Sequence, residues 1–285
     1  MIDRIDRFEG VRHTAFMAMV RSELLRVRRS PLVALHAALA AAIGLAAGLY
    51  FAATSWDSLL AYDAFVQLLG AGASLLAGIS CGLSLETERE AGDYANLAGH
   101  PSRRKAFCAK GVVLLGMGSL ACLAALFLFV GVLMLAGKPV PSAGIVALTF
   151  VALTAGSVAL YVISIVVALI WGRNAAITIG ALGFMVALAS LGGLGNGLVT
   201  GTLSASIAPL ALMAVPFTWP ARLASLSVEI PLAAAGRVPG TDGMLEALAS
   251  NTQASIALCA VGTAIVIAAW MAYVSCFEDT RRTKE

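Results

Sequence analysis

Six long, almost uncharged apolar stretches constrain this 285-residue chain more than any other feature. A bilayer core of about 30 Å takes about 20 apolar residues in a helix. Backbone polar groups inside a bilayer must be paired internally, and continuous runs without alternation indicate helices. The chain is 60% hydrophobic and 12% charged, whereas a soluble domain has about 25% charged residues. We therefore expect an all-α polytopic membrane protein with six transmembrane helices, at Pro31–Thr54, Leu60–Leu85, Gly111–Gly137, Ala143–Trp171, Asn174–Leu194 and Thr252–Tyr273.

The distribution of Lys and Arg predicts how these spans are oriented. Cytoplasmic loops carry an excess of Lys and Arg. With both termini inside, sixteen of the nineteen Lys and Arg are cytoplasmic, and only Lys138, Arg222 and Arg237 lie outside. We expect a multi-pass membrane protein with both termini in the cytoplasm. The first 30 residues carry seven Arg and lack a cleavage pattern, so no cleavable signal peptide is expected.

The N-terminal region (1–30) contains an amphipathic segment at Thr14–Arg29. Its apolar residues recur at helical spacing and share one face: Phe16, Met19, Val20, Leu24 and Val27. Such a helix is expected to lie along the inner membrane surface, with its basic residues near anionic head groups. The alternative is a solvated juxtamembrane helix that only sets the topology. Residues 31–285 then form the transmembrane domain and end in a cytoplasmic tail at 274–285.

The segment 195–251 is compatible with two topologies. Leu198–Val215 is apolar enough to form a seventh span. It would, however, contain Pro209, which disrupts helices, and would place the basic residues of the tail outside. We therefore expect 195–251 to form short outer helices that dip partly into the membrane, and keep a seventh span as the alternative.

Several kinds of chemistry find no support in the sequence. The phosphate-binding pattern GxxxxGK[ST] is absent, and Gly137 and Lys138 are followed by Pro139. HExxH, CxxC and GxSxG are absent too, so neither an enzyme nor a metal site is expected. Ion-coupled transport usually needs charges inside the spans, where Asp63 is the one candidate. His36 is expected to pack against a neighbouring helix.

A charged segment at 86–110, between the second and third spans, is the main candidate functional site. Leu85–Ala98 can be helical, and Gly99, His100 and Pro101 should break that helix. Ser102 is a plausible N-cap for a second helix that starts at Arg103 and continues into the third span. The predicted result is a charged helix-break-helix elbow under the membrane. Such an elbow suits docking of a separate protein; the alternative is a solvated loop that obeys the positive-inside rule.

The residues of this segment also carry a resemblance to a known family. With a basic helix (22–26) before the first span, it resembles the six-helix permeases of ABC-2 type transporters. It is most similar to the lantibiotic self-immunity permeases of the nisin, epidermin and mutacin systems. The residues that carry the resemblance are Glu88, Arg89, Glu90, Ala91, Gly92, Asn96, Leu97, Pro101, Ser102, Arg103, Lys105, Ala109 and Lys110.

The resemblance implies a function and partners. This chain would be the non-catalytic permease subunit of an ATP-driven exporter of a lantibiotic-like antimicrobial peptide, giving self-immunity or resistance. A dimeric ABC ATPase would bind ATP and Mg, and this chain would hold no cofactor. A second permease, homologous or identical, would complete the transporter in the bacterial cytoplasmic membrane. The implied ATPase-docking residues are Glu86, Glu88, Arg89, Glu90, Gly92, Asp93, Asn96, Leu97, Pro101, Ser102, Arg103 and Lys105.

Two further expectations concern the substrate and the alternatives. An outer gate or peptide contact is expected at Phe217, Trp219, Arg222 and Glu229, because the outer segment is too apolar to be a free loop. An ABC-2 exporter of another amphipathic compound, such as a drug or lipid, is the first alternative. A membrane enzyme or sensor component without an ATPase partner is the second, and an ATPase gene beside this one would argue against it.

Overall fold

Six helices are long and apolar enough to cross a membrane in the part of the chain that the computed structural model describes, which comprises residues 16–99, 102–190, 203, 210–236 and 244–276. This confirms the prediction of an all-α membrane fold. The spans lie in the helices α2 (Pro31–Ala53), α3 (Ser58–Gly92), α5 (Arg103–Leu135), α6 (Ala143–Trp171), α7 (Arg173–Ser190) and α11 (Met244–Cys276).

Short polar residues start several of these helices. Ser30 caps α2 by accepting a hydrogen bond from the Leu32 N–H, and Pro31 takes the first helical position, where a missing N–H costs nothing. The Asp57 carboxylate accepts hydrogen bonds from the backbone N–H groups of Leu59 and Leu60 at the start of α3. Ser142 caps α6 in the same way. These caps satisfy donors that the first turn of a helix leaves unpaired.

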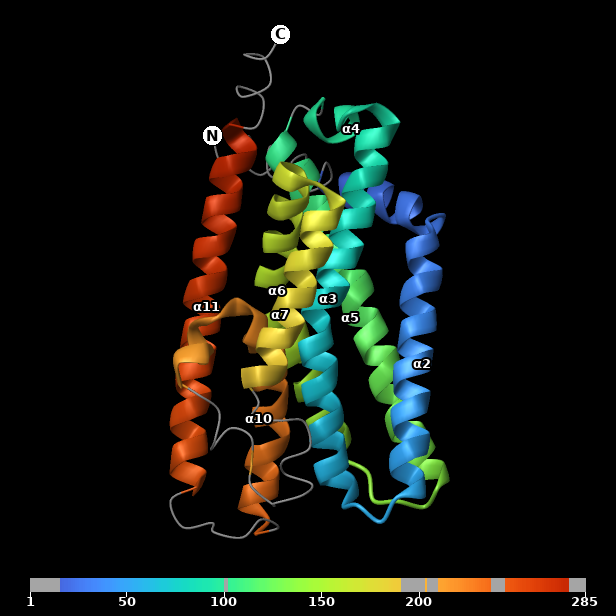
Figure 1. Cartoon of the computed structure of the whole chain (residues 1–285), viewed down its shortest axis with the longest axis vertical. Helices are drawn as coiled ribbons and strands as arrows, with labels where there is room; N and C mark the ends of the chain where they lie inside the picture. Colours follow the sequence, from blue (N-terminus) through green and yellow to red (C-terminus); the bar gives the residue numbers. More distant parts are fainter. Residues whose placement is uncertain (1–15, 100–101, 191–202, 204–209, 237–243, 277–285) are drawn as a thin grey trace, which may run out of the picture.

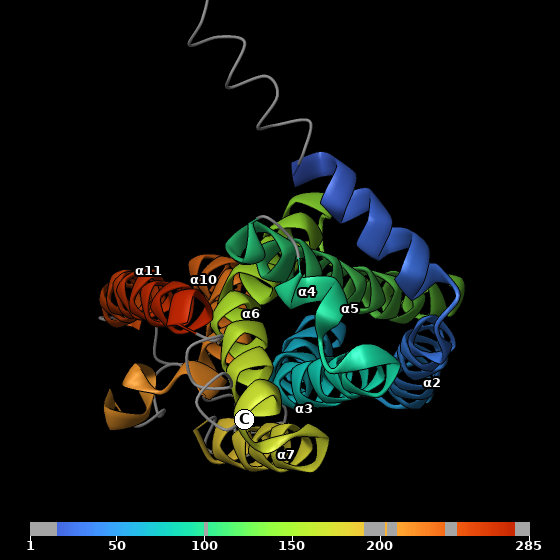
Figure 2. The ribbon, with the colours of Figure 1, turned by 90° about the horizontal axis from the view of Figure 1, so that it is seen from above.

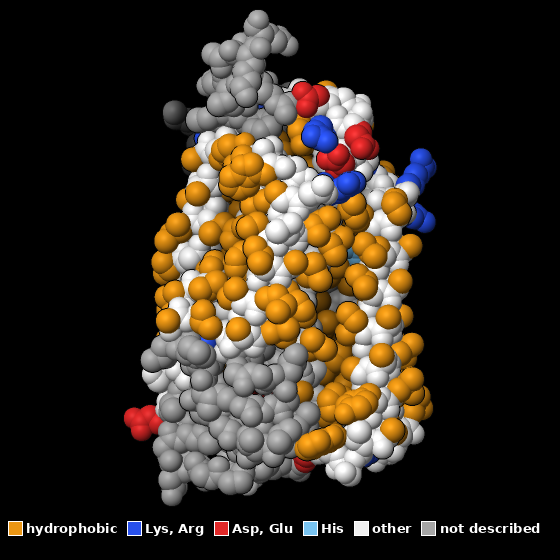
Figure 3. Space-filling view, viewed as in Figure 1, with side chains coloured by type: hydrophobic (Ala, Val, Ile, Leu, Met, Phe, Trp, Pro, Cys, Tyr) orange, Lys and Arg blue, Asp and Glu red, His pale blue; other side chains and the backbone are white. Residues whose placement is uncertain are grey.

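The helices are arranged around α3 and α6, which are the most buried spans (Figures 1 and 2). α7 packs along α3, and α2 packs along α5. α11 is the least buried span and packs mainly against α10 and α6. The apolar surface of the outer helices, orange in Figure 3, is suited to a hydrocarbon surrounding.

Two glycines on one face of α2 allow its close approach to α5. An added Cβ would lie 2.7 Å from the Ala125 carbonyl oxygen at Gly44 and 2.9 Å from the Val132 Cβ at Gly48. Their spacing is the small-xxx-small pattern of packed membrane helices. The chain has 28 glycines, so this spacing arises easily by chance, and the sequence alone does not single out these two residues.

The segment predicted to form short outer helices contains α10 (Trp219–Ala234), preceded by the 3-10 turns η1 (Leu210–Ala214) and η2 (Pro216–Thr218). At 16 residues α10 is about 24 Å long, too short to cross a core of about 30 Å. It packs against α3, α6 and α11 inside the bundle. Most of the alternative seventh span, Leu198–Val215, lies outside the described residues, and the last residues of the predicted outer segment belong to α11.

The predicted elbow and the N-terminal helix (16–28) lie at the same end of the bundle as the end of α11 (Figure 1). This end is called the elbow end below. α3 has 35 residues and is about 52 Å long, so it exceeds a bilayer core of about 30 Å. Its C-terminal turns therefore extend beyond the hydrocarbon region and carry the charged residues of the elbow.

Candidate functional site

The elbow is formed by the end of α3, the four-residue helix α4 (Ala95–Ala98) and the start of α5. α3 ends at Gly92, because Asp93 and Tyr94 adopt left-handed backbone conformations with φ of 47° and 65°. The helix predicted over Leu85–Ala98 is therefore interrupted at 93–94, a turn that was not predicted, and it ends at Ala98, next to the predicted break at 99–101. Such conformations are rare for residues with a Cβ and persist only where the surroundings hold them.

Two buried side chains hold this turn. Tyr94 and Leu97 are 3% and 1% exposed and pack in a core with Leu85, Phe107 and Leu114. α5 begins at Arg103 as predicted. Ser102 occupies its N-cap position, also as predicted, although the Ser102 side chain makes no capping hydrogen bond. The elbow is thus a packed element of the bundle.

The outward side of the elbow carries charged residues of both signs, which gather at this end in Figure 3. Arg89, Glu90, Asp93 and Arg104 are exposed, and Glu86, Arg103 and Lys105 are half-buried. Arg89 forms an ion pair with Glu86 at 2.7 Å. Arg103 Nε donates to the Ala98 carbonyl oxygen at 2.8 Å, and Arg104 Nε donates to Ser275 Oγ of α11 at 2.7 Å. These bonds hold the charges on a defined surface.

The inward side of the elbow carries a second set of charges, which we call the ionic cluster: Glu23, Arg26, Glu88 and Lys110. Glu88 Oε1 lies 2.8 Å from Arg26 Nη1 and 3.1 Å from Lys110 Nζ. Glu23 bonds the same two cations, at 3.0 Å and 3.1 Å. Two acids and two bases make the cluster neutral, which burial of charge requires. Lys110 and both carboxylates are buried, whereas Arg26 is half-exposed.

The ionic cluster joins the N-terminal helix to the bundle. Seen from above, this helix lies along the edge of the bundle beside α5 and runs crosswise to the spans, as expected for an interfacial helix (Figure 2). Its buried positions are Glu23 and Val27, while Met17, Leu24 and Leu25 are exposed. Leu24, predicted on the same apolar stripe as Val27, is exposed and so is free to contact the membrane surface, as an interfacial helix requires. The helix contacts the protein through Glu23 and leaves leucines on its other side.

The structure divides the predicted docking residues into two groups. Arg89, Glu90, Gly92, Asp93 and Asn96 are exposed, and Glu86, Ser102, Arg103 and Lys105 are partly exposed. Glu88 and Leu97 are buried and face the inside of the elbow. Pro101 lies outside the described residues. Docking stays a prediction, and the exposed group is the one that can take part in it.

The residues predicted as an outer gate lie in and beside α10. Trp219, Arg222 and Glu229 are buried, and Phe217 of η2 is half-buried. Trp219 Nε1 donates to the Met213 carbonyl oxygen at 2.9 Å, and the Trp219 ring packs on Gly262 of α11. Arg222 Nη2 donates to the Ser190 carbonyl oxygen at 3.4 Å. Their contact with a substrate stays a prediction, and in this structure they fasten α10 to its neighbours.

A buried polar network beside them was not predicted from the sequence. Asp63 of α3 accepts hydrogen bonds from Gln67 Nε2 at 2.7 Å and from Ser225 Oγ of α10 at 2.9 Å. Glu229, one turn further along α10, interacts electrostatically with Asp63. Gln67 and Ser225 are polar residues inside apolar helices. Gln67 lies four residues after Asp63 on α3, so helical spacing alone places these two side chains together, whereas only the packing of α10 against α3 brings Ser225 to Asp63.

His36 has the packing role predicted for it. Its Nδ1 lies 2.8 Å from the Leu32 carbonyl oxygen, and its Nε2 lies 3.0 Å from Ser80 Oγ on α3. Both ring nitrogens thus have partners within the protein.

A comparison with protein-family models identifies the family of this chain. The family model described as ABC-2 family transporter protein matches residues 19–190. This match covers more than half of the chain and includes the N-terminal helix, the ionic cluster, the elbow and the helices through α7. The chain belongs to the ABC-2 transporter family.

As an ABC-2 permease, the chain is the membrane-spanning subunit of an ABC transporter, and family membership implies an ABC ATPase partner. α10 and α11 lie beyond the matched residues, so the buried polar network joins a matched helix to an unmatched one. No curated protein and no solved structure matches this permease.

Proposed function

We propose that this permease exports a lantibiotic or similar cationic antimicrobial peptide from the membrane, driven by an ATPase dimer that binds the elbow. The observation that carries the docking step is the elbow itself, a rigid charged surface at one end of a membrane bundle. Charge complementarity on such a surface can select a partner and its orientation. The peptide assignment is supported by the resemblance of 86–110 to lantibiotic immunity permeases.

The elbow end is proposed to face the cytoplasm of a bacterial cell. Of the twelve Lys and Arg among the described residues, ten lie at this end, and only Lys138 and Arg222 lie elsewhere. The positive-inside rule assigns such an end to the cytoplasm. An ATPase could then reach the elbow, and a second permease chain, homologous or identical, would complete the transporter.

ATP-driven closure of the ATPase dimer would push the elbow. Because Glu88 and Lys110 join the end of α3 to the start of α5, both helices would move with it. The ionic cluster would carry the N-terminal helix along. We propose that this movement rocks the two permease halves and opens an outward path past η2 and α10.

The test is co-purification from cells that express this chain with the ABC ATPase encoded beside it, followed by ATPase assays in nanodiscs with and without a lantibiotic. The proposal expects a stable complex whose ATP hydrolysis rises with the peptide. A complex that responds to a drug or a lipid but not to the peptide would support the alternative exporter. Failure of an ATPase to bind would contradict the docking step.

A charge-reversal variant sharpens this experiment. Glu90 is exposed on the elbow, and Glu90→Lys changes its surface charge without breaking the ionic cluster. The expected result is at least a tenfold loss of ATPase association with normal membrane insertion. Glu246→Lys is the matched control, since Glu246 is an exposed acid at the opposite end of the bundle. Equal effects of the two changes would contradict docking at the elbow.

A further inference from the structure

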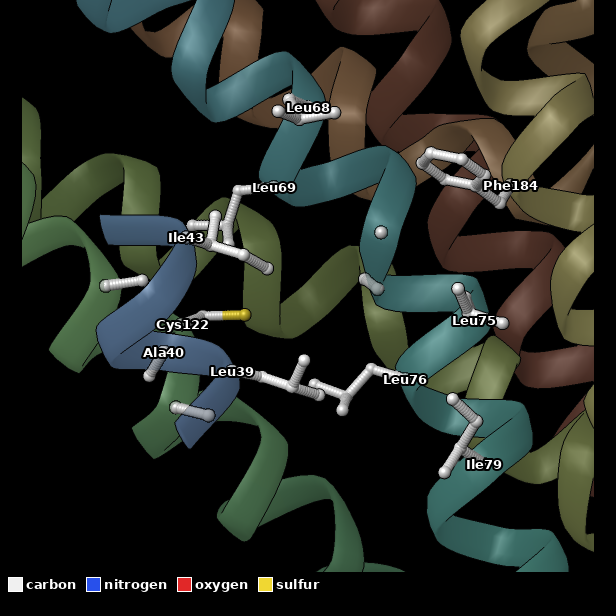
Figure 4. A pocket seen from close by; sticks show the side chains of 14 residues that line it. Leu39, Ala40, Ile43, Leu68, Leu69, Leu75, Leu76, Ile79, Cys122 and Phe184 are labelled. Atoms are coloured by element: carbon white, nitrogen blue, oxygen red, sulfur yellow. The ribbon is translucent and has the colours of Figure 1, made fainter. Parts of the chain in front are cut away.

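An apolar groove of about 350 Å³ lies on the membrane-facing side of the bundle. α2, α3 and α5 line it, and Phe184 of α7 stands at one edge (Figure 4). The space-filling view shows this face hollowed between α2 and α3 (Figure 3). The lining residues lie near the middle of their helices; Ile43 of α2 and Cys122 of α5 are examples. The groove is therefore at the depth of the hydrocarbon core.

The groove exists because α2 packs along α5 and makes few contacts with α3. Gly72 deepens the groove, since an added Cβ there would meet no atom within 4 Å. Among the lining side chains the one polar atom is the thiol of Cys122. A site without hydrogen-bonding partners does not hold water.

The size and chemistry of the groove decide which occupant fits. An extended peptide would leave its backbone N–H and C=O groups unpaired, which is costly in a hydrocarbon surrounding. One turn of a helix about 10 Å wide fills about 420 Å³, so a helix of a second copy does not fit inside. An apolar cavity of about 150 Å³ takes one benzene molecule, so about 350 Å³ holds about a dozen carbon atoms of a flexible chain.

We propose that this groove binds a single acyl chain of a membrane phospholipid. Lipid tails are as apolar as leucine, so the chain gains little from the hydrophobic effect on leaving the bilayer. It gains contacts with the groove walls on several sides, and dispersion contacts add up over a dozen carbons. The site selects the chain by shape and makes no use of the head group. The bound chain fills the gap between α2 and α3 and supports α2 from the side that α5 does not cover.

This inference does not depend on the proposed function. The groove lies on a different part of the molecule from the elbow, and it would bind a chain whatever the transporter exports. Loss of ATPase binding and loss of lipid binding are separate measurements on the same preparation.

The test uses the full chain in nanodiscs that contain a phospholipid with a diazirine in the middle of one acyl chain. After irradiation, mass spectrometry maps the adducts. The expected adducts lie on the groove segments of α2, α3 and α5, in equal yield for phosphatidylglycerol and phosphatidylethanolamine. Gly72→Leu fills the groove from its floor and is expected to lower these adducts at least fivefold.

Gly131→Leu is the matched control. Gly131 also lies in a spanning helix and has open space at its Cβ position, but it does not line the groove. Its adduct pattern should equal that of the unchanged protein. If Gly72→Leu does not fold, Gly72→Ala gives a milder version, with an expected loss of about twofold. Unchanged groove adducts in a folded Gly72 variant would overturn the proposal.

A second measurement tests whether another copy of this chain covers the groove in place of an acyl chain. Gly72→Cys in a background without other cysteines would form disulfide-linked dimers under mild oxidation if a second copy covered the groove. The proposal expects monomers, with Gly72→Cys protected from a thiol reagent by phospholipid and exposed after delipidation. Efficient dimer formation would overturn it.

Discussion

Lys110 Nζ lies 3.1 Å from Glu88 Oε1, so the start of α5 is tied to the end of α3 directly beneath the elbow. The two residues are 22 positions apart and stand on opposite sides of the turn. Arg26 and Glu23 extend this bond to the N-terminal helix. A force on the elbow is therefore shared by three helices.

Removal of Glu88 should destabilise the protein strongly. Glu88→Ala leaves Lys110 and Arg26 with one carboxylate in place of two, and breaking a buried ion pair typically costs about 3–5 kcal/mol. Thermal unfolding in detergent should show a clear fall in Tm. Glu86→Ala breaks the partly exposed pair with Arg89 and should cost about 0–1 kcal/mol. Similar Tm values for the two variants would argue against a structural role for the ionic cluster.

A methyl group at Gly156 should displace α10. An added Cβ would lie 2.7 Å from the backbone N and Cα of Pro220, and backbone cannot move aside as a side chain can. We expect Gly156→Ala to lower stability by about 1–3 kcal/mol through overpacking. Gly131→Ala, where the same methyl meets open space, should be neutral or slightly stabilising. Chemical unfolding followed by tryptophan fluorescence checks this. Effects of the same sign and size would contradict the packing of α10 against α6.

The hydrogen bond from Ser225 to Asp63 should stabilise the protein more than the hydrogen bond between Ser227 and Thr149, which also involves α10. Ser225 donates to a carboxyl group, whereas Ser227 bonds the Thr149 hydroxyl at 2.9 Å. Ser225 Oγ also accepts from Gln67 Nε2 at 3.2 Å, so Ser225→Ala removes a partner from two buried groups, whereas Ser227→Ala removes one from Thr149. Each buried polar group that loses its partner costs about 1–3 kcal/mol. Ser225→Ala should therefore lower Tm more than Ser227→Ala. The reverse order would show that the network around Asp63 does little to hold α10.

Thiol accessibility should reveal the orientation of the bundle. In a cysteine-free background, Glu90→Cys on the elbow should react with a membrane-impermeant maleimide only after the cells are opened. Glu246→Cys at the opposite end should react in intact cells. Both side chains are exposed, so access to water does not differ between them. Labelling of Glu90→Cys in intact cells would reverse the proposed topology.

Much of the fold can be predicted from the lengths of the apolar stretches in the sequence alone. The predicted range Ala143–Trp171 coincides with α6, and the other spans differ mainly at their ends. The ends of the spanning helices were harder to predict, because the helices continue beyond the apolar runs. α3 runs on to Gly92 and α5 begins at Arg103, since charged residues form helices readily once their side chains find water or partners.

The candidate site was predicted less well, for a physical reason. Local rules placed a break at 99–101, between the end of α4 and the start of α5, but they missed the earlier turn at Asp93 and Tyr94, which burial of Tyr94 and Leu97 holds. The resemblance placed Glu88 among the docking residues, although its side chain is buried and paired with Arg26, 62 residues away. Such pairings depend on how helices pack, and spacing along one helix does not reveal them.

α3 joins the two ends of the molecule as one uninterrupted rod, with Asp63 near one end and Glu88 near the other. These residues are separated by about 38 Å of helix. A tilt of about 5° about Glu88 would shift Asp63 by about 3 Å over that length. This is as large as the 2.9 Å separation of Ser225 Oγ and Asp63 Oδ1. A rotation of α3 by a few degrees at the elbow end, relative to α10, would therefore be enough to make or break this single hydrogen bond at the other end of the helix.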